Sequence, residues 1–143
     1  MQNLTKTLYR MAVKSPFGKI ALIVEDETDT AEMLAEMVRL CGYEARHAYS
    51  AQPVMDLLYQ KKPILILLDI ILPDTNGIEL LRAIRSEKQF DTLPVILISG
   101  NCQPSDIEKG LLSGASAYLT KPVAFWELKE TIEKLLQRQV SSL

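Results

Sequence analysis

Short apolar runs alternate along this chain with longer segments that mix apolar and polar residues. Three runs are uninterrupted, at residues 20–24, 64–68 and 95–98. Two weaker strand candidates lie at residues 43–49 and 118–119. Strands that are buried on both faces of a parallel sheet read as continuous apolar runs. The pattern therefore predicts five strands, three of them buried on both faces.

A segment with helical spacing of apolar residues follows each strand candidate. Residues 30–41 carry such a stripe, and Gly42 stands where a helix is commonly closed by glycine. Ser50 is predicted as the N-cap of a helix that runs to about residue 60, with Pro53 in its first turn. Further helices are predicted around residues 78–84, 104–114 and 125–136.

Five strand–helix pairs with short connections are typical of an α/β fold. In such a fold a doubly wound parallel sheet is covered by helices on both faces. Right-handed crossovers bring the carboxyl ends of all strands to one edge of the sheet. Ligands of open sheets bind at that edge, so the chemistry of this chain is expected there.

Polar residues follow four of the five strand candidates. They are Glu25, Asp26 and Glu27 after the first, Asp69 after the third, Ser99 after the fourth and Lys121 after the fifth. Neighbouring carboxylates repel each other, and a hard divalent cation removes that cost. Mg²⁺ fits because it prefers oxygen ligands, and no His or Cys accompanies the carboxylates to favour a softer metal. The set suits phosphoryl transfer, with Asp69 as the nucleophile.

Four motifs in this order resemble the receiver domain of bacterial two-component response regulators. The motifs are VEDE at 24–27, LLDIILPDTNG at 67–77, PVILISG at 94–100 and YLTKP at 118–122. The resemblance extends over about residues 19–139. It implies a flavodoxin-like (βα)5 fold with strand order 2-1-3-4-5.

The resemblance also implies a role for each residue at the strand ends. Asp69 corresponds to the phospho-acceptor. Asp26 corresponds to a direct Mg²⁺ ligand, and Glu25 to the acid that holds the ion through water. The backbone carbonyl of Ile71 corresponds to a further ligand, and Lys121 to the lysine that pairs with the phosphoryl group.

Further positions match the switch and the loop of the family. Ser99 corresponds to the switch hydroxyl, and Tyr118 to the aromatic residue that rotates. The Lys121–Pro122 peptide bond is expected to be cis, which proline makes accessible. Gly77 is expected where a side chain would crowd the next helix, and Asn76 is expected to bond the loop backbone.

The function that follows is a phosphorelay switch rather than an enzyme. A histidine kinase or phosphotransfer protein would phosphorylate Asp69, with self-catalysed phosphorylation and dephosphorylation as the only chemistry. The change would alter the binding of a downstream protein, or of a second copy, at the last strand and its flanking helices. Trp126 suits a binding anchor there. The bulky Ile71 is expected to slow loss of the phosphoryl group.

Two alternative classes remain open at this point. A Mg²⁺ hydrolase of the aspartyl-phosphate type normally needs a second carboxylate two residues after its nucleophile, where this chain has Ile71. A flavin or nucleotide binder is disfavoured because no GxGxxG or GxxxxGK[ST] motif occurs. The acids after the first strand would also repel phosphate unless a metal is bound.

Composition narrows the class of protein. The chain has 143 residues, of which 48% are hydrophobic and 24% charged, as in an ordinary globular domain. A net charge of -2 argues against direct binding of nucleic acid. Cys41 and Cys102 form no CxxC pair, which excludes a disulfide scaffold or zinc ribbon and favours free thiols in a reducing cytoplasm. No apolar stretch reaches the roughly 18 residues of a membrane span, and no secretory signal is present, so a cytoplasmic protein is expected.

Three segments are expected along the chain. Residues 1–18 form a basic N-terminal extension that carries Lys6, Arg10 and Lys14 and no acidic residue. Residues 19–139 form the receiver domain, and residues 140–143 a C-terminal tail. This leaves two expectations open, a single-domain regulator and a receiver cut from a longer protein.

Overall fold

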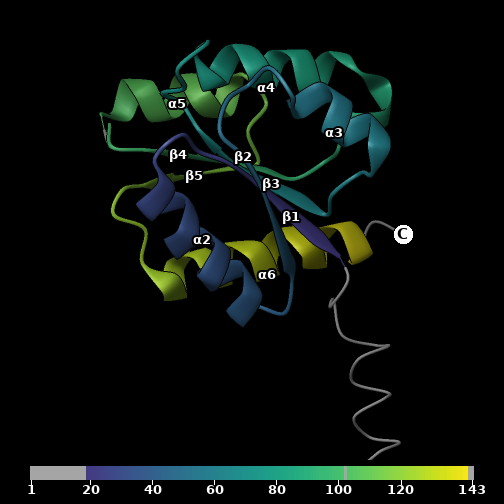
Figure 1. The fold of residues 1–143 in the computed structure, drawn as a ribbon, viewed down its shortest axis with the longest axis vertical. Coiled ribbons are helices and arrows are strands. Elements are labelled where there is room, and N and C mark those ends of the chain that lie inside the picture. Colours follow the sequence, from purple (N-terminus) through teal and green to yellow (C-terminus); the bar gives the residue numbers. More distant parts are fainter. Residues whose placement is uncertain (1–18, 102, 142–143) are drawn as a thin grey trace, which may run out of the picture.

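A computed structural model describes residues 19–101 and 103–141, which form three layers (Figure 1). The middle layer is a five-stranded sheet in which each neighbouring pair is parallel, in the order β2-β1-β3-β4-β5. This order confirms the predicted doubly wound topology. The elements in chain order are β1 (Ile20–Val24), α2 (Thr28–Leu40), β2 (Glu44–Ala48), α3 (Val54–Gln60), β3 (Leu65–Asp69), α4 (Gly77–Ser86), a 3-10 helix η1 (Lys88–Phe90), β4 (Val95–Ser99), α5 (Pro104–Leu112), β5 (Ala117–Thr120) and α6 (Phe125–Ser141).

The helices divide between the two faces of the sheet. Helices α3, α4 and α5 cover one face, and α2 and α6 cover the other, as Figure 1 shows. Each face holds its own apolar core, one built around Leu81 and Phe90 and the other around Leu34 and Leu128. All residues of β1, β3 and β4 are buried, which confirms the three strands read from uninterrupted apolar runs.

Strand β2 differs because it lies at the edge of the sheet. Its side chains alternate between exposed and half-buried positions before the buried Ala48. Helix α2 ends two residues before Gly42, which has a φ of 96°, a left-handed conformation that glycine adopts without strain. The expected glycine closure of this helix is confirmed.

The prediction that Ser50 caps α3 is wrong. The helix begins at Val54, with Pro53 at the N-cap position and no side-chain cap. The amides of Ala51 and Gln52 are instead bound by the carboxylate of Asp74, at 3.0 Å to Oδ1 and 2.9 Å to Oδ2. This partner lies more than twenty residues away in the sequence, so the local pattern could not show it.

The predicted basic extension at residues 1–18 and the thiol of Cys102 lie outside the described residues, as do residues 142 and 143. Helix α6 continues to Ser141. The segment boundaries expected after residues 18 and 139 remain predictions. Among the helices that the structure describes, none combines the length and apolar character that a bilayer crossing requires.

Candidate functional site

The carboxyl ends of the strands bring the predicted residues together. Glu25 follows β1, Asp69 ends β3, Ser99 ends β4 and Lys121 follows β5. The first three are only 1%, 6% and 2% exposed, and among residues 19–101 and 103–137, whose burial is described, they are the buried polar or charged residues. Because burying polar groups costs free energy unless they are partnered, their concentration at one sheet edge marks a site.

Lys121 joins two of these carboxylates. Its Nζ donates hydrogen bonds to Glu25 Oε1 at 2.7 Å and to Asp69 Oδ2 at 2.9 Å. The following peptide bond, Lys121–Pro122, is cis, as the sequence resemblance implied. The lysine thus reaches from the last strand of the sheet to the acids at its centre.

The pKa values of Glu25 and Lys121 are both raised in this site. Burial and the nearby Asp69 together raise the pKa of Glu25 to about 7, although the hydrogen bond from the Lys121 ammonium opposes the rise. Burial by itself would lower the pKa of Lys121. Its hydrogen bonds to Glu25 and Asp69 outweigh that effect, so the pKa of Lys121 is raised above its ordinary value. The ammonium is therefore firmly held as the counter-ion of the two acids.

Three carboxylates could hold a metal ion here. Glu25, Asp26 and Asp69 each offer an oxygen atom, and these atoms lie within 4.8 Å of one another. Asp26 is exposed, while the other two are buried. Three carboxylates face one ammonium, so the cluster has an excess of negative charge that a divalent cation would balance. The all-oxygen donor set fits Mg²⁺.

The loop after Asp69 folds back over the end of its own strand. The amide of Ile71 donates to Asp69 Oδ1 at 3.1 Å, and Ile71 also forms an antiparallel bridge with Asn76. The Ile71 side chain is 73% exposed, so an apolar surface stands beside the acceptor carboxylate. The cluster, the ammonium and this loop form one continuous site.

Gly77 starts α4 against the backbone of the acceptor strand. A Cβ placed on Gly77 would overlap the carbonyl oxygen of Asp69 and meet the Cα of Ile70 at 2.8 Å. Asn76 Oδ1 accepts from the amide of Ile78 at 2.8 Å and caps the helix. The expectation for Gly77 is confirmed. Asn76 was expected to bond the loop backbone, and its side chain binds an amide in the first turn of α4 instead.

Ser99 and Tyr118 meet at a residue that the sequence analysis missed. Ser99 Oγ accepts from the amide of Asn101 at 3.1 Å, and the Tyr118 hydroxyl donates to the Asn101 carbonyl at 2.8 Å. The Asn101 side chain accepts in turn from the amide of Gln103 at 3.3 Å. An Asn soon after a strand end is a turn signal, but nothing in the sequence pairs it with Tyr118.

His47 is a second residue whose link to the site was missed. Its Nε2 donates to the main-chain carbonyl of Glu25 at 2.7 Å, which is the assignment that a carbonyl acceptor requires. The amide of Glu25 donates to the carbonyl of Ala48 at 3.0 Å. Strand β2 therefore holds the backbone of Glu25 at both its amide and its carbonyl group.

Comparison with known proteins gives one consistent family. Residues 21–133 match the response regulator receiver domain. The phosphate regulon transcriptional regulatory protein PhoB of Pseudomonas aeruginosa is 36% identical over 121 residues, which cover 85% of this chain and 53% of that protein. The chain thus spans about half the length of this curated relative.

Solved structures agree with this match. A putative response regulator from Chloroflexus aurantiacus is similar with a TM-score of 0.80 and 31% identity, over 83% of this chain and 98% of that one. A CheY-like receiver domain protein from Methanospirillum hungatei has a TM-score of 0.79 and 30% identity, over 87% and 98% of the two chains.

Proposed function

This chain belongs to the response regulator receiver domain family, and from that premise we propose that Asp69 is its phospho-acceptor. A receiver domain of two-component systems is a phosphorelay switch and not a conventional enzyme, so the hydrolase and nucleotide-binding alternatives are not favoured. The observation that carries the assignment is the pairing of Asp69 with Lys121 inside an acidic cluster.

The proposed reaction transfers one phosphoryl group to a carboxylate oxygen of Asp69. The new O–P bond forms as the P–N bond of a phosphohistidine on a kinase or phosphotransfer protein breaks, which gives an acyl phosphate. Glu25, Asp26, Asp69 and the Ile71 carbonyl would hold Mg²⁺. The ion would offset charge on the phosphoryl oxygens. Lys121 would pair with one of these oxygens. In self-catalysed loss of the group, water would attack the phosphorus atom and the O–P bond would break, which restores the Asp69 carboxylate and releases inorganic phosphate.

Ser99 would report the phosphoryl group to the rest of the domain. Its Oγ accepts a hydrogen bond from Asn101, which leaves the hydroxyl proton free to bind a phosphoryl oxygen. A shift of Ser99 would move Asn101, and with it the carbonyl that binds the Tyr118 hydroxyl. Phosphorylation would thereby change the population of Tyr118 positions on β5.

The output surface proposed for this switch comprises β5 and its flanking helices α5 and α6. Trp126 at the start of α6 is 72% exposed, while Phe125 beside it is half-buried. The Lys129 ammonium lies 5.3 Å from the Trp126 ring. An exposed tryptophan with a cation beside it suits a protein partner or a second copy of the chain.

The setting of the proposed function is a cytoplasmic phosphorelay. The partners would be a histidine kinase or phosphotransfer protein on one side and a downstream protein on the other. The PhoB relative is named as a transcriptional regulatory protein, and that name describes the whole protein, of which the matched region is 53%. For the receiver domain of this chain we propose protein contacts and no direct nucleic-acid contact, in keeping with its net charge of -2.

The test is the intact mass of the protein after incubation with acetyl phosphate, with and without Mg²⁺. One added phosphoryl group that requires Mg²⁺ and is lost in Asp69→Asn is the expected result. Asp29→Asn is the matched control, because Asp29 is an exposed carboxylate on α2 outside the cluster. Labelling that persists in Asp69→Asn, or a parent protein that gains no mass, contradicts the assignment.

A further inference from the structure

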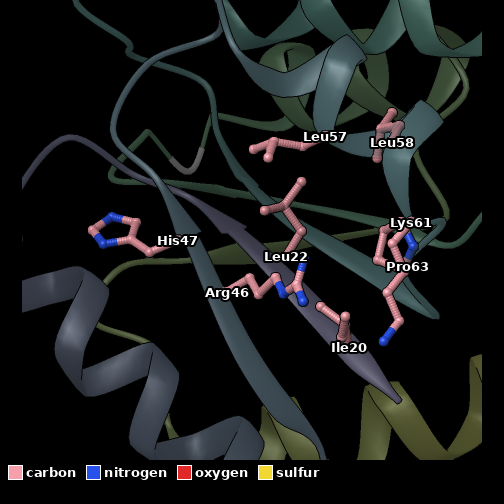
Figure 2. A pocket seen from close by; sticks show the side chains of 8 residues that line it. All are labelled: Ile20, Leu22, Arg46, His47, Leu57, Leu58, Lys61 and Pro63. Atoms are coloured by element: carbon pink, nitrogen blue, oxygen red, sulfur yellow. The ribbon is translucent and has the colours of Figure 1, made fainter. Parts of the chain in front are cut away.

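A cavity of about 180 Å³ lies beneath α3 at the β2 side of the sheet (Figure 2). It is lined by Ile20, Leu22, Arg46, His47, Leu57, Leu58, Lys61 and Pro63. Ile20 begins β1, and Pro63 lies two residues before β3. The cavity therefore lies toward the amino ends of the central strands, away from the carboxyl ends that carry the acidic cluster.

The cavity combines an apolar floor with a cationic opening. Ile20, Leu22 and Leu58 are buried, so the floor offers aliphatic surface. In Figure 2 the side chains of Arg46 and Lys61 extend toward Ile20 from two sides. The His47 ring points away from this group, toward Glu25.

Neither cation is neutralised by the protein itself. In the part of the chain that the structure describes, the side chains of Arg46 and Lys61 form no ion pair and no hydrogen bond. Other surface cations, such as Arg39 and Lys134, do have carboxylate partners. Two unpaired cations beside a concave apolar surface are complementary to an amphipathic anion.

We propose that this cavity binds a small carboxylic acid with an aromatic or aliphatic body. A cavity of about 150 Å³ is large enough for a benzene ring, so this one holds a single ring and its carboxylate. The ring would lie against Leu22 and Leu58. The carboxylate would face Arg46, whose planar guanidinium binds carboxylates through paired hydrogen bonds, with Lys61 as a second charge.

Charge argues against the chain's own N-terminal extension as the occupant. Residues 1–18 carry three basic residues and no acidic one, so this extension would be repelled by Arg46 and Lys61. A small anion meets no such obstacle.

The test is a titration of the ¹⁵N-labelled full chain with benzoate, followed by amide chemical shifts. Benzyl alcohol and benzylamine serve as neutral and cationic probes with a similar ring. We expect saturable shifts for benzoate at Ile20, Leu22, Leu58 and Lys61, with a dissociation constant of about 1 mM for so small a probe. The neutral and cationic probes should bind more weakly by about tenfold or more.

Charge-removing variants separate this site from general anion binding. Arg46→Gln and Lys61→Gln should each weaken benzoate binding by about tenfold, because a hydrogen bond to a charged group is lost. Both residues are exposed, so the fold should persist, which an unchanged melting temperature checks. Arg39→Gln, on α2, should leave the affinity unchanged.

Three results would overturn the proposal. They are the absence of saturable shifts at the cavity, equal affinity for benzoate and benzylamine, and equal benzoate affinity in the parent and both variants. The titration uses unphosphorylated protein without Mg²⁺, so its result is independent of the assignment of Asp69.

Discussion

Lys121 donates a 2.7 Å hydrogen bond to Glu25, a carboxylate whose side chain is only 1% exposed. The Lys121 side chain is 28% exposed, and its ammonium also binds Asp69. The lysine is thus the single basic partner of two buried acids in the described site. Its replacement tests how the charge of the cluster is balanced.

Lys121→Met should lower the free energy of unfolding by about 1.5–3 kcal/mol, because two buried carboxylates lose a charged hydrogen-bond donor. Mg²⁺ should then raise the melting temperature of the variant more than that of the parent, since the ion would replace the missing positive charge. Thermal unfolding with and without Mg²⁺ measures both effects.

Lys134→Met is the control for this experiment. Lys134 pairs with Glu130 on α6, where both side chains are largely exposed, so its loss should change stability by less than about 0.5 kcal/mol. If Mg²⁺ raises the melting temperature equally in the parent and in Lys121→Met, the ion does not bind the carboxylates that pair with Lys121.

Gly77→Ala should destabilise the domain although alanine favours helices. The helical preference of alanine over glycine is about 0.5–1 kcal/mol. The added Cβ would overlap the Asp69 carbonyl and meet the Ile70 Cα, and backbone atoms cannot move aside as a flexible side chain can. Overpacking of this kind costs about 1–3 kcal/mol, so a net loss is expected in urea unfolding.

Gly100 provides the matched substitution. A Cβ on Gly100 has no heavy atom within 4 Å, so Gly100→Ala should be neutral or stabilising by about 0.4–1 kcal/mol. If Gly77→Ala and Gly100→Ala unfold at the same urea concentration, crowding by the backbone of Asp69 and Ile70 does not explain why residue 77 is glycine.

Asp74→Ala should destabilise the junction of the loops before α3 and α4 in a pH-dependent way. The hydrogen bond from the Ala51 amide, followed by that from Gln52, lowers the pKa of Asp74. A lowered pKa in the folded state gives stability that is present above the unfolded value, about 3.9, and is lost as the pH falls through the folded value. The gap in melting temperature between parent and variant should therefore be larger at pH 7 than in acid.

Glu108→Ala on α5 controls for the loss of an exposed carboxylate. It should leave the melting temperature nearly unchanged at both pH values, because no hydrogen bond to Glu108 is present in the described structure. If the difference in melting temperature between the parent and Asp74→Ala stays constant with pH, the charge of Asp74 does not contribute to stability.

Ile71→Asn should shorten the lifetime of phosphorylated Asp69 by a few-fold. The Ile71 side chain is 73% exposed beside the acceptor, and an amide there could hold a water molecule that the apolar group excludes. Loss of the phosphoryl group is measured as the half-life of the added mass after acetyl phosphate is removed. Leu112→Asn, at an 80% exposed leucine on α5, should leave the half-life unchanged. Equal half-lives in the parent and Ile71→Asn would contradict this role.

The sequence predicts features that arise from a local pattern of residues or from the topology of the fold. The buried strands are visible as apolar runs, and parallel topology alone places Asp69, Ser99 and Lys121 at one edge. Contacts between distant segments left no local signal. One example is the carboxylate of Asp74, which binds the backbone before α3 where Ser50 was predicted to cap the helix. Another is the hydrogen bond from His47 to the carbonyl of Glu25. The cavity beneath α3 likewise depends on how β1, β2 and α3 pack.

The attachment of Glu25 to β2 has a consequence for local opening. An outer strand frays more readily than the centre of a sheet, and here fraying would release both the amide and the carbonyl of a residue in the acidic cluster. The integrity of the cluster would then depend on an edge strand of the sheet. An ion that binds only the closed form would in turn slow hydrogen exchange at the amides of β2, far along the chain from Asp69.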